Sequence, residues 1–428
     1  MRAPQIPSAP HRSSESRFGR KRKRRRITLI VASVVAIVLA GTAAFAIANY
    51  NDLSNGIHRS LITLPSASSA PLPGVTQNTG ATNILVMGLD SRLDENGNRL
   101  PANVYNALHA GNQSDGGYNT NVLMLIHIPA GGGKAVGISI PRDDYATLAG
   151  SPDGVSASKI KEAYGLALDA KLRKLVNAGG MTYAEAYQQA RAAARQAEIA
   201  TVSNFLGGVT INHFIEVTMA AFYEVATAVQ PITVCLNEAT SDAYSGASFP
   251  AGIQKLTASQ AVSFVRQRRD TSNPKLDFTD LDRERRQQAF IVSLAYKLKQ
   301  ANTFTNFGTM QSLIDTAKQN IALDTNFNLL SFAGQAARLA GGNISFVTLP
   351  IIGFGVKDHK DVNLVDLTQI HALVSQLLLD SPPPTPTPSP TGKAGGTKPS
   401  TPIPVPTASN VYNDYKTPLQ GGAIPCVK

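Results

Sequence analysis

The chain contains only two cysteines among its 428 residues, which excludes a scaffold held by many disulfides and a zinc module ligated by cysteines. Charged side chains make up only 16% of the sequence and hydrophobic ones 43%, so the chain can bury a core rather than remain disordered or fibrous. It contains no G-x-S-x-G and no H-E-x-x-H sequence, the usual signatures of α/β-hydrolases and zinc proteases. It also has no internal repeat. At 428 residues the chain exceeds one average domain of about 100–200 residues, and its length also fits one large domain with appendages.

The positive charge of the chain is concentrated in its N-terminal residues. Residues 1–26 contain ten Lys or Arg and one Glu, so they carry +9 of the formal net charge of +11 and leave +2 on the other 402 residues. A nucleic-acid-binding domain would instead carry its basic side chains on a folded surface. The charge therefore belongs to a tail and does not indicate a DNA- or RNA-binding protein.

An uncharged apolar segment of 22 residues, Ile27–Ala48, follows the basic tail directly. A bilayer core of about 30 Å requires about 20 apolar residues in a helix, so this segment predicts a transmembrane helix. Basic flanks stay cytoplasmic, which predicts a single-pass protein of the cell membrane with a cytoplasmic tail and an extracytoplasmic body. The alternative is a cleaved signal peptide, because the A-F-A sequence at 44–46 resembles a cleavage site. Both interpretations export the body.

Composition divides the rest of the chain into four parts. Residues 49–80 are predicted to form a polar stalk, and a globular pattern occupies 81–380. A Pro/Thr-rich linker over 381–407 favours extended polyproline and cannot build a core. A short C-terminal segment, 408–428, follows it.

The globular part alternates strand patterns with helical ones. Apolar, β-branched runs predict strands covered by helices on both faces. These strands are Asn83–Leu89, Val122–Ile128 and Ala135–Ile140, with shorter candidates over Asn212–Val217, Ile232–Leu236 and Ser345–Pro350. Helical patterns occupy Ser158–Leu206 with a break at Gly179-Gly180, Leu256–Gln267 and Asp280–Leu298. The alternation predicts an α/β fold layered as an α-β-α sandwich.

Arginines gather at the ends of these elements. Arg142 follows the strand Ala135–Ile140 and a proline, a position at which α/β folds place ligand-binding residues. Other arginines end one predicted helix and open the next: Arg266, Arg268, Arg269, Arg283, Arg285 and Arg286. Guanidinium groups suit phosphate oxygens because they donate paired hydrogen bonds and keep their proton. The alternative is a solvated basic helix face.

Nucleophilic machinery is scarce by comparison. The seven histidines are scattered, and His127 and His213 lie in or beside apolar strands, where a core residue is expected more often than a base. Asp90 ends the first predicted strand, and a carboxylate beside phosphate oxygens suits Mg²⁺. Phosphoryl transfer fits this inventory because it depends on positioning and charge neutralisation more than on a protein nucleophile.

Six stretches of the globular part resemble the LytR–CpsA–Psr (LCP) family, in that family's order. They are NILVMGLDSR, NTNVLMLIHI, VGISIPRDDY, KIKEAYG, LTASQAVSFVRQRRD and DFTDLDRERRQQAFI. KIKEAYG and PITVCLNEATSDAYSGASF are similar to actinobacterial members in particular. The resemblance implies a central mixed sheet and an apolar groove for a polyprenyl chain. It also implies a Mg²⁺-dependent phosphotransferase that moves an anionic or arabinogalactan-type glycopolymer from a polyprenyl-pyrophosphate carrier to a peptidoglycan hydroxyl during cell-wall assembly.

The resemblance also implies roles for individual residues. Asp90 matches the Asp of the family's G-x-D motif, one of two ligands of Mg²⁺, a site that Mn²⁺ also suits. Asn121 stands where the second ligand is the Asp of R-S-D-T-M-M, so the metal site has one charge fewer, and Asp115 is a candidate substitute. The residues implied to contact the carrier's head group are Arg142, Arg266, Arg268, Arg283 and Gln287.

Other functions stay open from the sequence. The same residues would serve a polyprenyl-pyrophosphate hydrolase if water replaced the acceptor hydroxyl. A non-catalytic envelope scaffold that binds polyprenyl lipid is supported by Asn121 in place of an acidic ligand. Transcriptional regulation is an older label of the family, and the basic tail is its only support here.

The two cysteines allow one disulfide. Cys235 lies in a predicted interior strand, and Cys426 lies beyond the Pro/Thr linker. The predicted compartment is outside the membrane, where disulfides persist, so we expect a Cys235–Cys426 bridge that ties the C-terminal segment to the domain. The alternative is a buried, inert thiol at Cys235 and a free thiol at Cys426.

Overall fold

The computed structural model describes residues 48–64, 80–109, 118–299, 307–329, 331–332, 335, 339, 341–379 and 417–428. The chain divides into a larger unit that begins at Gly56 and a shorter one, Met1–Asn55, in which the described residues are helical. Among the described helices, none combines the length and the apolar character needed to cross a membrane. Residues 27–47 of the expected transmembrane helix, the basic tail and the Pro/Thr linker lie outside the described residues.

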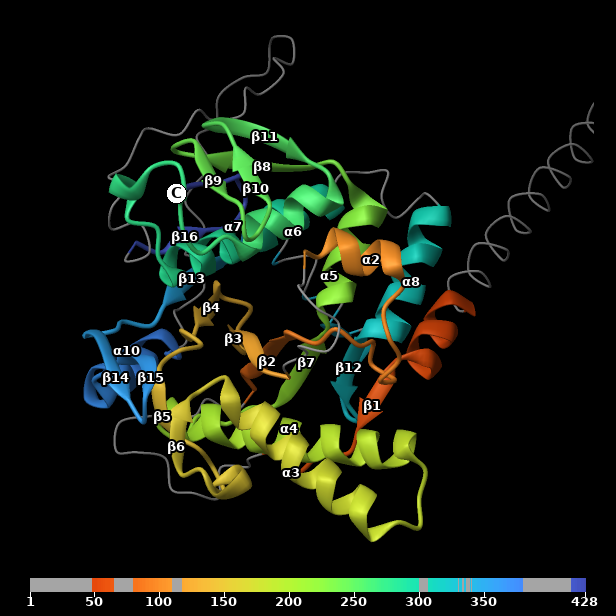
Figure 1. The fold of residues 1–428 in the computed structure, drawn as a ribbon. Helices are drawn as coiled ribbons and strands as arrows, with labels where there is room; N and C mark the ends of the chain where they lie inside the picture. Colours follow the sequence, from red (N-terminus) through yellow and green to blue (C-terminus); the bar gives the residue numbers. More distant parts are fainter. Residues whose placement is uncertain are drawn as a thin grey trace, which may run out of the picture. The chain divides into compact units, whose positions relative to one another are not determined.

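The larger unit is built on a mixed sheet of eight strands (Figure 1). Its order is β1 (His58–Ser60), β12 (Ile321–Asp324), β7 (His213–Val217), β2 (Thr82–Leu89), β3 (Thr120–Ile128), β4 (Ala135–Ser139), β13 (Ile344–Thr348) and β16 (Leu419–Gln420). The pairs β1–β12, β2–β7 and β4–β13 are parallel, and the others are antiparallel. The prediction of an α/β fold with a central mixed sheet is confirmed.

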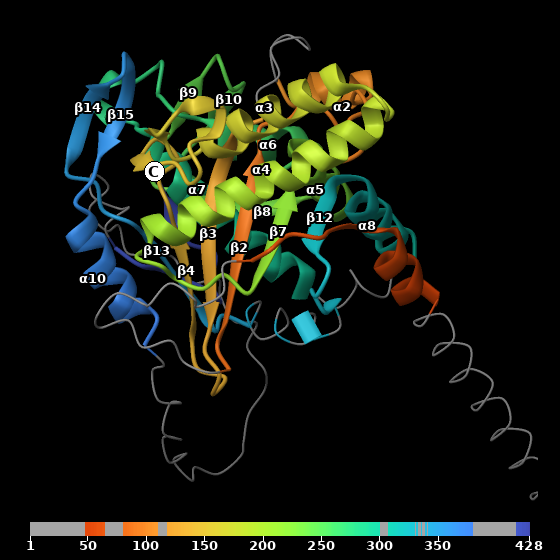
Figure 2. The ribbon, with the colours of Figure 1, turned by 90° about the horizontal axis from the view of Figure 1, so that it is seen from below.

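Helices cover both faces of this sheet (Figures 1 and 2). On one face, α4 and α10 share a core with the sheet in which Val202 and Ile370 are fully buried together with Leu85 and Leu125. On the other face, Gln288 of α7 donates to the hydroxyl groups of Ser139 and Thr348, at 2.8 and 2.9 Å. The helices are α2 (Ala102–Ala107), α3 (Glu162–Ala178), α4 (Tyr183–Phe205), α5 (Met219–Val229), α6 (Ala258–Arg266), α7 (Asp280–Lys299), α8 (Phe307–Asn320) and α10 (Leu367–Leu377).

The expected break in the long Ala-rich helical region separates α3 from α4. α3 ends at Ala178, and Gly179 follows with φ of 66°, a conformation that glycine adopts without strain. α4 then begins with a capping box, in which the Thr182 hydroxyl accepts from the Glu185 backbone N–H and the Glu185 carboxylate accepts from that of Thr182. The sequence predicts this break from glycine alone, and the capping box defines where the second helix begins.

Smaller sheets and hairpins surround the main sheet. Their strands are β5 (Tyr145–Thr147), β6 (Ala157–Lys159), β8 (Ile232–Leu236), β9 (Thr240–Asp242), β10 (Ala247–Phe249), β11 (Gly252–Leu256), β14 (Gly353–Lys357), β15 (Lys360–Leu364) and β17 (Cys426–Val427). β5 pairs with β6, β9 with β10, β14 with β15, and β8 lies between β11 and β17.

The sheets extend beyond the predicted bounds of the domain, 81 and 380. β1 lies in the segment expected to be a stalk, yet it pairs with β12, and β16 and β17 of the C-terminal segment pair with β13 and β8. These strands have two or three residues and are held by backbone hydrogen bonds, which any side chain permits. They therefore leave no periodic pattern in the sequence.

Two arginines of α4 are buried with two glutamates. Arg191 donates to Glu95 at 2.6 Å and also to Glu216, while Arg195 donates to Glu216 at 2.7 Å and also to Glu95. Arg191 and both glutamates are completely buried. Burial alone would raise the pKa of Glu216, but Arg195 and Arg191 outweigh it and hold that pKa below its usual range. The network joins α4, β7 and the loop after β2, and the Ala-rich helical pattern did not predict it.

The structure joins Cys235 of β8 to Cys426 of β17, which are also register partners in the two parallel strands. The bridge closes a loop of 191 residues in sequence. Because a crosslink restricts the unfolded chain, replacing both cysteines by serine should lower the free energy of unfolding by about 2–4 kcal/mol. Urea denaturation of the purified, oxidised protein measures this loss. Two free thiols in the wild-type protein under denaturing, non-reducing conditions would contradict the bridge.

Candidate active site

The pairing of β2, β3 and β4 brings three predicted site residues to one end of the sheet. Asp90 follows β2, and its backbone N–H donates to the carbonyl oxygen of Asn119 at 3.0 Å. The antiparallel pairing of β3 and β4 puts Met124 opposite Ser139, so Arg142, three residues after the end of β4, comes within hydrogen-bond distance of Asn121. Residues that are far apart in the sequence therefore become neighbours through strand pairing.

Arg142 is almost fully buried and donates to two groups. Its Nη1 donates to the amide oxygen of Asn121 at 2.7 Å. Its Nε and Nη2 donate to the two carboxylate oxygens of Asp280, the first residue of α7, at 3.1 and 3.0 Å. This paired geometry holds the guanidinium plane in one orientation.

Two further predicted arginines converge on the same carboxylate. Arg283, one turn along α7, donates to Asp280 at 2.9 Å, and Nε of Arg268 lies 3.9 Å from a carboxylate oxygen of Asp280. Burial alone would raise the pKa of Asp280, but Arg283 and Arg142 outweigh it and keep that pKa below its usual range. Three guanidinium groups thus share one anion.

The remaining predicted residues lie at the edge of this cluster. Arg266 donates to the backbone carbonyl of Leu108, and Gln287 lies 3.4 Å from the carbonyl oxygen of Val265. Burial lowers the pKa of Arg266 and of Arg268, and the charge of Asp90 opposes both shifts.

Positive charge prevails in this cluster even though several carboxyl groups lie nearby. Burial lowers the pKa of Arg283 to about 10, so it stays charged at neutral pH. Burial and the charge of Asp280 raise the pKa of Glu284 to about 8, so this carboxyl is mostly uncharged at pH 7. A ligand with several anionic oxygens, such as a pyrophosphate, would match these donors.

Three arginines that the sequence grouped with this cluster have other partners. Arg285 donates to the carbonyl of Thr417 at 2.6 Å, and buried Arg286 donates to Gln267 at 2.7 Å. Arg269 lies over the ring of Tyr244, 4.3 Å from its centroid. The alternative of a solvated basic face is wrong for α7, because its arginines Arg283, Arg285 and Arg286 are all buried.

A metal ion at this site would have one free carboxylate. The Asp90 carboxylate forms no hydrogen bond or ion pair with any residue that the structure describes, whereas the Asn121 amide oxygen already accepts from Arg142. Within the described ranges, no three His, Cys, Asp or Glu side chains are placed to hold a metal together. Asp115 lies outside those ranges. The donors fit a Mg²⁺ ion that takes most of its ligands from phosphate and water.

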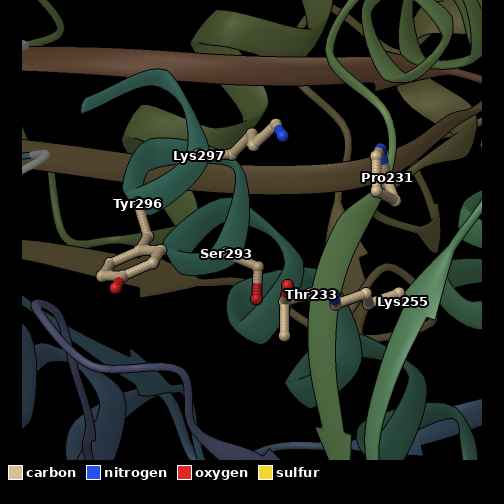
Figure 3. Close-up of a pocket in the computed structure, with 6 residues that line it drawn as sticks. All are labelled: Pro231, Thr233, Lys255, Ser293, Tyr296 and Lys297. Atoms are coloured by element: carbon tan, nitrogen blue, oxygen red, sulfur yellow. The ribbon is translucent and has the colours of Figure 1, made fainter. Parts of the chain in front are cut away.

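A separate pocket of about 220 Å³ lies between α7, β8 and β11 (Figure 3). None of the predicted site residues lines it. Its polar lining does not match the apolar groove that the family resemblance implies. The residues that line it are Pro231, Thr233, Lys255, Ser293, Tyr296 and Lys297.

Comparison with known protein families gives a match over most of the chain. The model of the LytR_cpsA_psr family matches residues 59–377. The chain belongs to this family. The match begins within β1 and ends at the last residue of α10, so it includes both Asp90 and Arg142 and every other residue of the arginine cluster.

Several LCP relatives are similar to this chain. It is 34% identical over 353 residues to the cell wall biosynthesis protein LcpA of Corynebacterium glutamicum, a match that covers 82% of this chain and 65% of LcpA, just under two thirds of that protein. It is 22% identical over 313 residues to the polyisoprenyl-teichoic acid–peptidoglycan teichoic acid transferase TagU of Bacillus subtilis, covering 73% of this chain and 83% of TagU. The solved structure of an LCP enzyme from Actinomyces oris has 18% identity and a TM-score of 0.47, covering 76% of this chain and 96% of that one.

One member of the cluster was missed from the sequence. Asp280 lies within the quoted stretch DFTDLDRERRQQ, three residues before Arg283, so both side chains lie on one face of α7. That spacing is the signal that was available. The contact with Arg142, 138 residues earlier, was not visible in the sequence.

Proposed function

We propose that this LCP-family chain transfers a glycopolymer from a polyprenyl-pyrophosphate carrier to a hydroxyl group of peptidoglycan, forming a phosphodiester link. The observation that carries the proposal is the convergence of Arg142, Arg268 and Arg283 on Asp280. The names of LcpA and TagU support a role in cell-wall assembly. The proposed polymer is of the anionic or arabinogalactan type, which the resemblance to actinobacterial members of the family implies.

The reaction needs charge stabilisation more than a protein nucleophile. The acceptor hydroxyl oxygen forms a bond to the phosphorus that carries the glycan and gives up its proton to solvent. The bond from this phosphorus to the bridging oxygen breaks, which releases polyprenyl phosphate. Negative charge develops on the bridging oxygen and is spread over the phosphoryl oxygens. Arg142, Arg268 and Arg283 would donate to these oxygens in place of Asp280.

The proposed cofactor is Mg²⁺, with Mn²⁺ as a substitute. Asp90 would be its anionic protein ligand and the amide oxygen of Asn121 a neutral one. The ion would neutralise charge on the pyrophosphate when bound. In the proposed topology, residues 1–26 lie in the cytoplasm, Ile27–Ala48 crosses the cell membrane once, and the catalytic unit lies outside the cell.

A transfer assay tests this function. The full chain is reconstituted in lipid vesicles with a labelled glycan on a prenyl-pyrophosphate carrier, with and without peptidoglycan. We expect the label to become covalently attached to peptidoglycan and prenyl phosphate to be released only when peptidoglycan is present. Equal release of prenyl phosphate without peptidoglycan would identify a hydrolase. Binding of the carrier without any release would identify a scaffold.

Restoring the acidic ligand tests the metal site. We expect Asn121→Asp to lower the Mg²⁺ concentration for half-maximal activity severalfold, because a carboxylate binds Mg²⁺ more strongly than an amide oxygen does. Asp90→Ala should abolish metal-dependent activity. Magnesium titrations of activity, together with Mn²⁺ binding measured by electron paramagnetic resonance, check both. Titrations that neither substitution changes would show that these residues do not hold the metal.

A further inference from the structure

The β14–β15 hairpin exposes a stripe of apolar side chains. Ile352, Phe354 and Val356 are 65, 67 and 66% exposed, and alternate residues of a strand share one face. Between them, Gly355 contributes no side chain, and a Cβ there would come within 3.0 Å of the Leu364 side chain. The strand therefore turns its bulky apolar side chains away from the domain, the reverse of the usual pattern of strands that face water.

The hairpin is attached to the segment that carries Arg142. The backbone N–H of Asn363, in β15, donates to the carbonyl oxygen of Asp143 at 2.8 Å. The side-chain amide of Asn363 donates to the buried Asp144 carboxylate at 3.0 Å. The apolar stripe is thus held by backbone and side-chain hydrogen bonds one and two residues from a candidate catalytic arginine.

The turn of the hairpin is polar and carries charges of both signs, from Lys357, Asp358, Lys360 and Asp361. Lys357 is exposed, and Lys360 pairs with Glu162 at 2.5 Å. Asp358, in the turn, accepts from the Tyr145 hydroxyl at 2.8 Å, so it too is engaged by the domain. An exposed apolar surface bordered by polar and charged side chains marks a surface that contacts a membrane or another protein.

The chain also limits how far this unit can lie from a bilayer. In the proposed topology the membrane-spanning segment ends at Ala48, and β1 begins at His58, ten residues later. Ten residues reach at most about 35 Å even when fully extended, whereas a domain of about 300 residues is about 50 Å across. In the proposed topology this tether is shorter than the domain is wide, which keeps the faces of the domain within reach of the lipid surface.

We propose that the stripe Ile352, Phe354 and Val356 binds the outer surface of the lipid bilayer and holds the Arg142 segment at the level of lipid-linked pyrophosphate. This proposal rests on the proposed membrane topology and function. The hairpin and β1 lie toward opposite edges of the main sheet (Figures 1 and 2). The tether and the stripe would therefore be two separate attachments, and two attachments restrict the rotation that one would allow.

Tryptophan fluorescence tests the contact directly, because the chain has no tryptophan. Phe354→Trp places a single reporter on the stripe. Tyr183→Trp is the matched control: Tyr183 is 60% exposed and lies at the start of α4, at the end of the α3–α4 pair that points away from the hairpin (Figures 1 and 2). Both full-length variants are reconstituted in vesicles of phosphatidylethanolamine and phosphatidylglycerol, made with ordinary or brominated acyl chains.

We expect the Phe354→Trp reporter to emit at shorter wavelength than the control and to lose more than half of its intensity in brominated lipid, while the control does not change. A reporter that is neither shifted nor quenched would overturn the proposal. A shifted but unquenched reporter would show that protein, such as a second copy, covers the stripe, and would also overturn it. Val356→Trp replaces the first variant if that variant fails to fold. The measurement needs no activity, so its failure is distinct from failure of the transfer assay.

Discussion

Replacing Arg142 by alanine should lower the rate of glycan transfer about 10²–10³-fold, the effect of removing one preorganised donor to a developing charge. The structure supports this magnitude because Arg142 is buried and its orientation is fixed by paired hydrogen bonds to Asp280. Arg268→Ala should have an effect of the same order. Rates are measured by transfer of labelled glycan at saturating carrier and metal.

Three comparisons separate catalysis from folding in this experiment. Arg142→Lys should restore only part of the rate, because an ammonium group lacks the paired geometry. Arg173→Ala is the control, since Arg173 is half exposed and pairs only with surface carboxylates. Unfolding curves of each variant show whether lost activity reflects lost structure. Near-normal turnover in both Arg142→Ala and Arg268→Ala would refute the assignment.

Replacing Arg191 by methionine should lower the free energy of unfolding by about 3–5 kcal/mol, since it removes one of the two guanidinium groups that compensate the buried carboxylates of Glu95 and Glu216. Arg191 is completely buried and donates to Glu95, to Glu216 and to the hydroxyl groups of Tyr164 and Tyr187. Methionine occupies a similar volume, so the loss would come from the lost charge compensation rather than from a large cavity, because Arg195 alone would then face both carboxylates. Guanidinium chloride denaturation measures the change.

The matching surface substitution is Arg173→Met. Its ion pairs with Asp153 and Asp169 are exposed to water, so its removal should cost less than about 1 kcal/mol. If Arg191→Met destabilised the protein no more than Arg173→Met, the buried network would not contribute to stability as inferred. If Glu216→Gln rescued part of the loss in Arg191→Met, the coupling between the two residues would be measured directly.

Much of the fold was predictable from the sequence because its main strands and helices bury apolar side chains in regular patterns. Strands β2, β3, β4, β7, β8 and β13 and helices α3, α4, α6 and α7 lie close to the predicted ranges. Residues 158–159, expected to be helical, belong to β6, and β12, α5, α8 and α10 were not predicted. The candidate site was predictable to the same degree, as Asp90, Arg142, Arg268 and Arg283 follow or begin such elements. Each of these signals is contained in a short stretch of consecutive residues, which is the range over which sequence patterns predict structure.

The tertiary structure alone decided which of the charged residues meet. In the folded protein, Asp280 accepts hydrogen bonds from Arg142, and Arg286 donates to Gln267 instead of joining that cluster. Arg191 is buried and donates to both Glu95 and Glu216. It also placed β1, β16 and β17 in the sheets although their sequences show no strand pattern. The physical reason is common to these cases. Charge pairing and backbone pairing require segments that are far apart in the chain to come within bonding distance. They do so only once the apolar layers have packed.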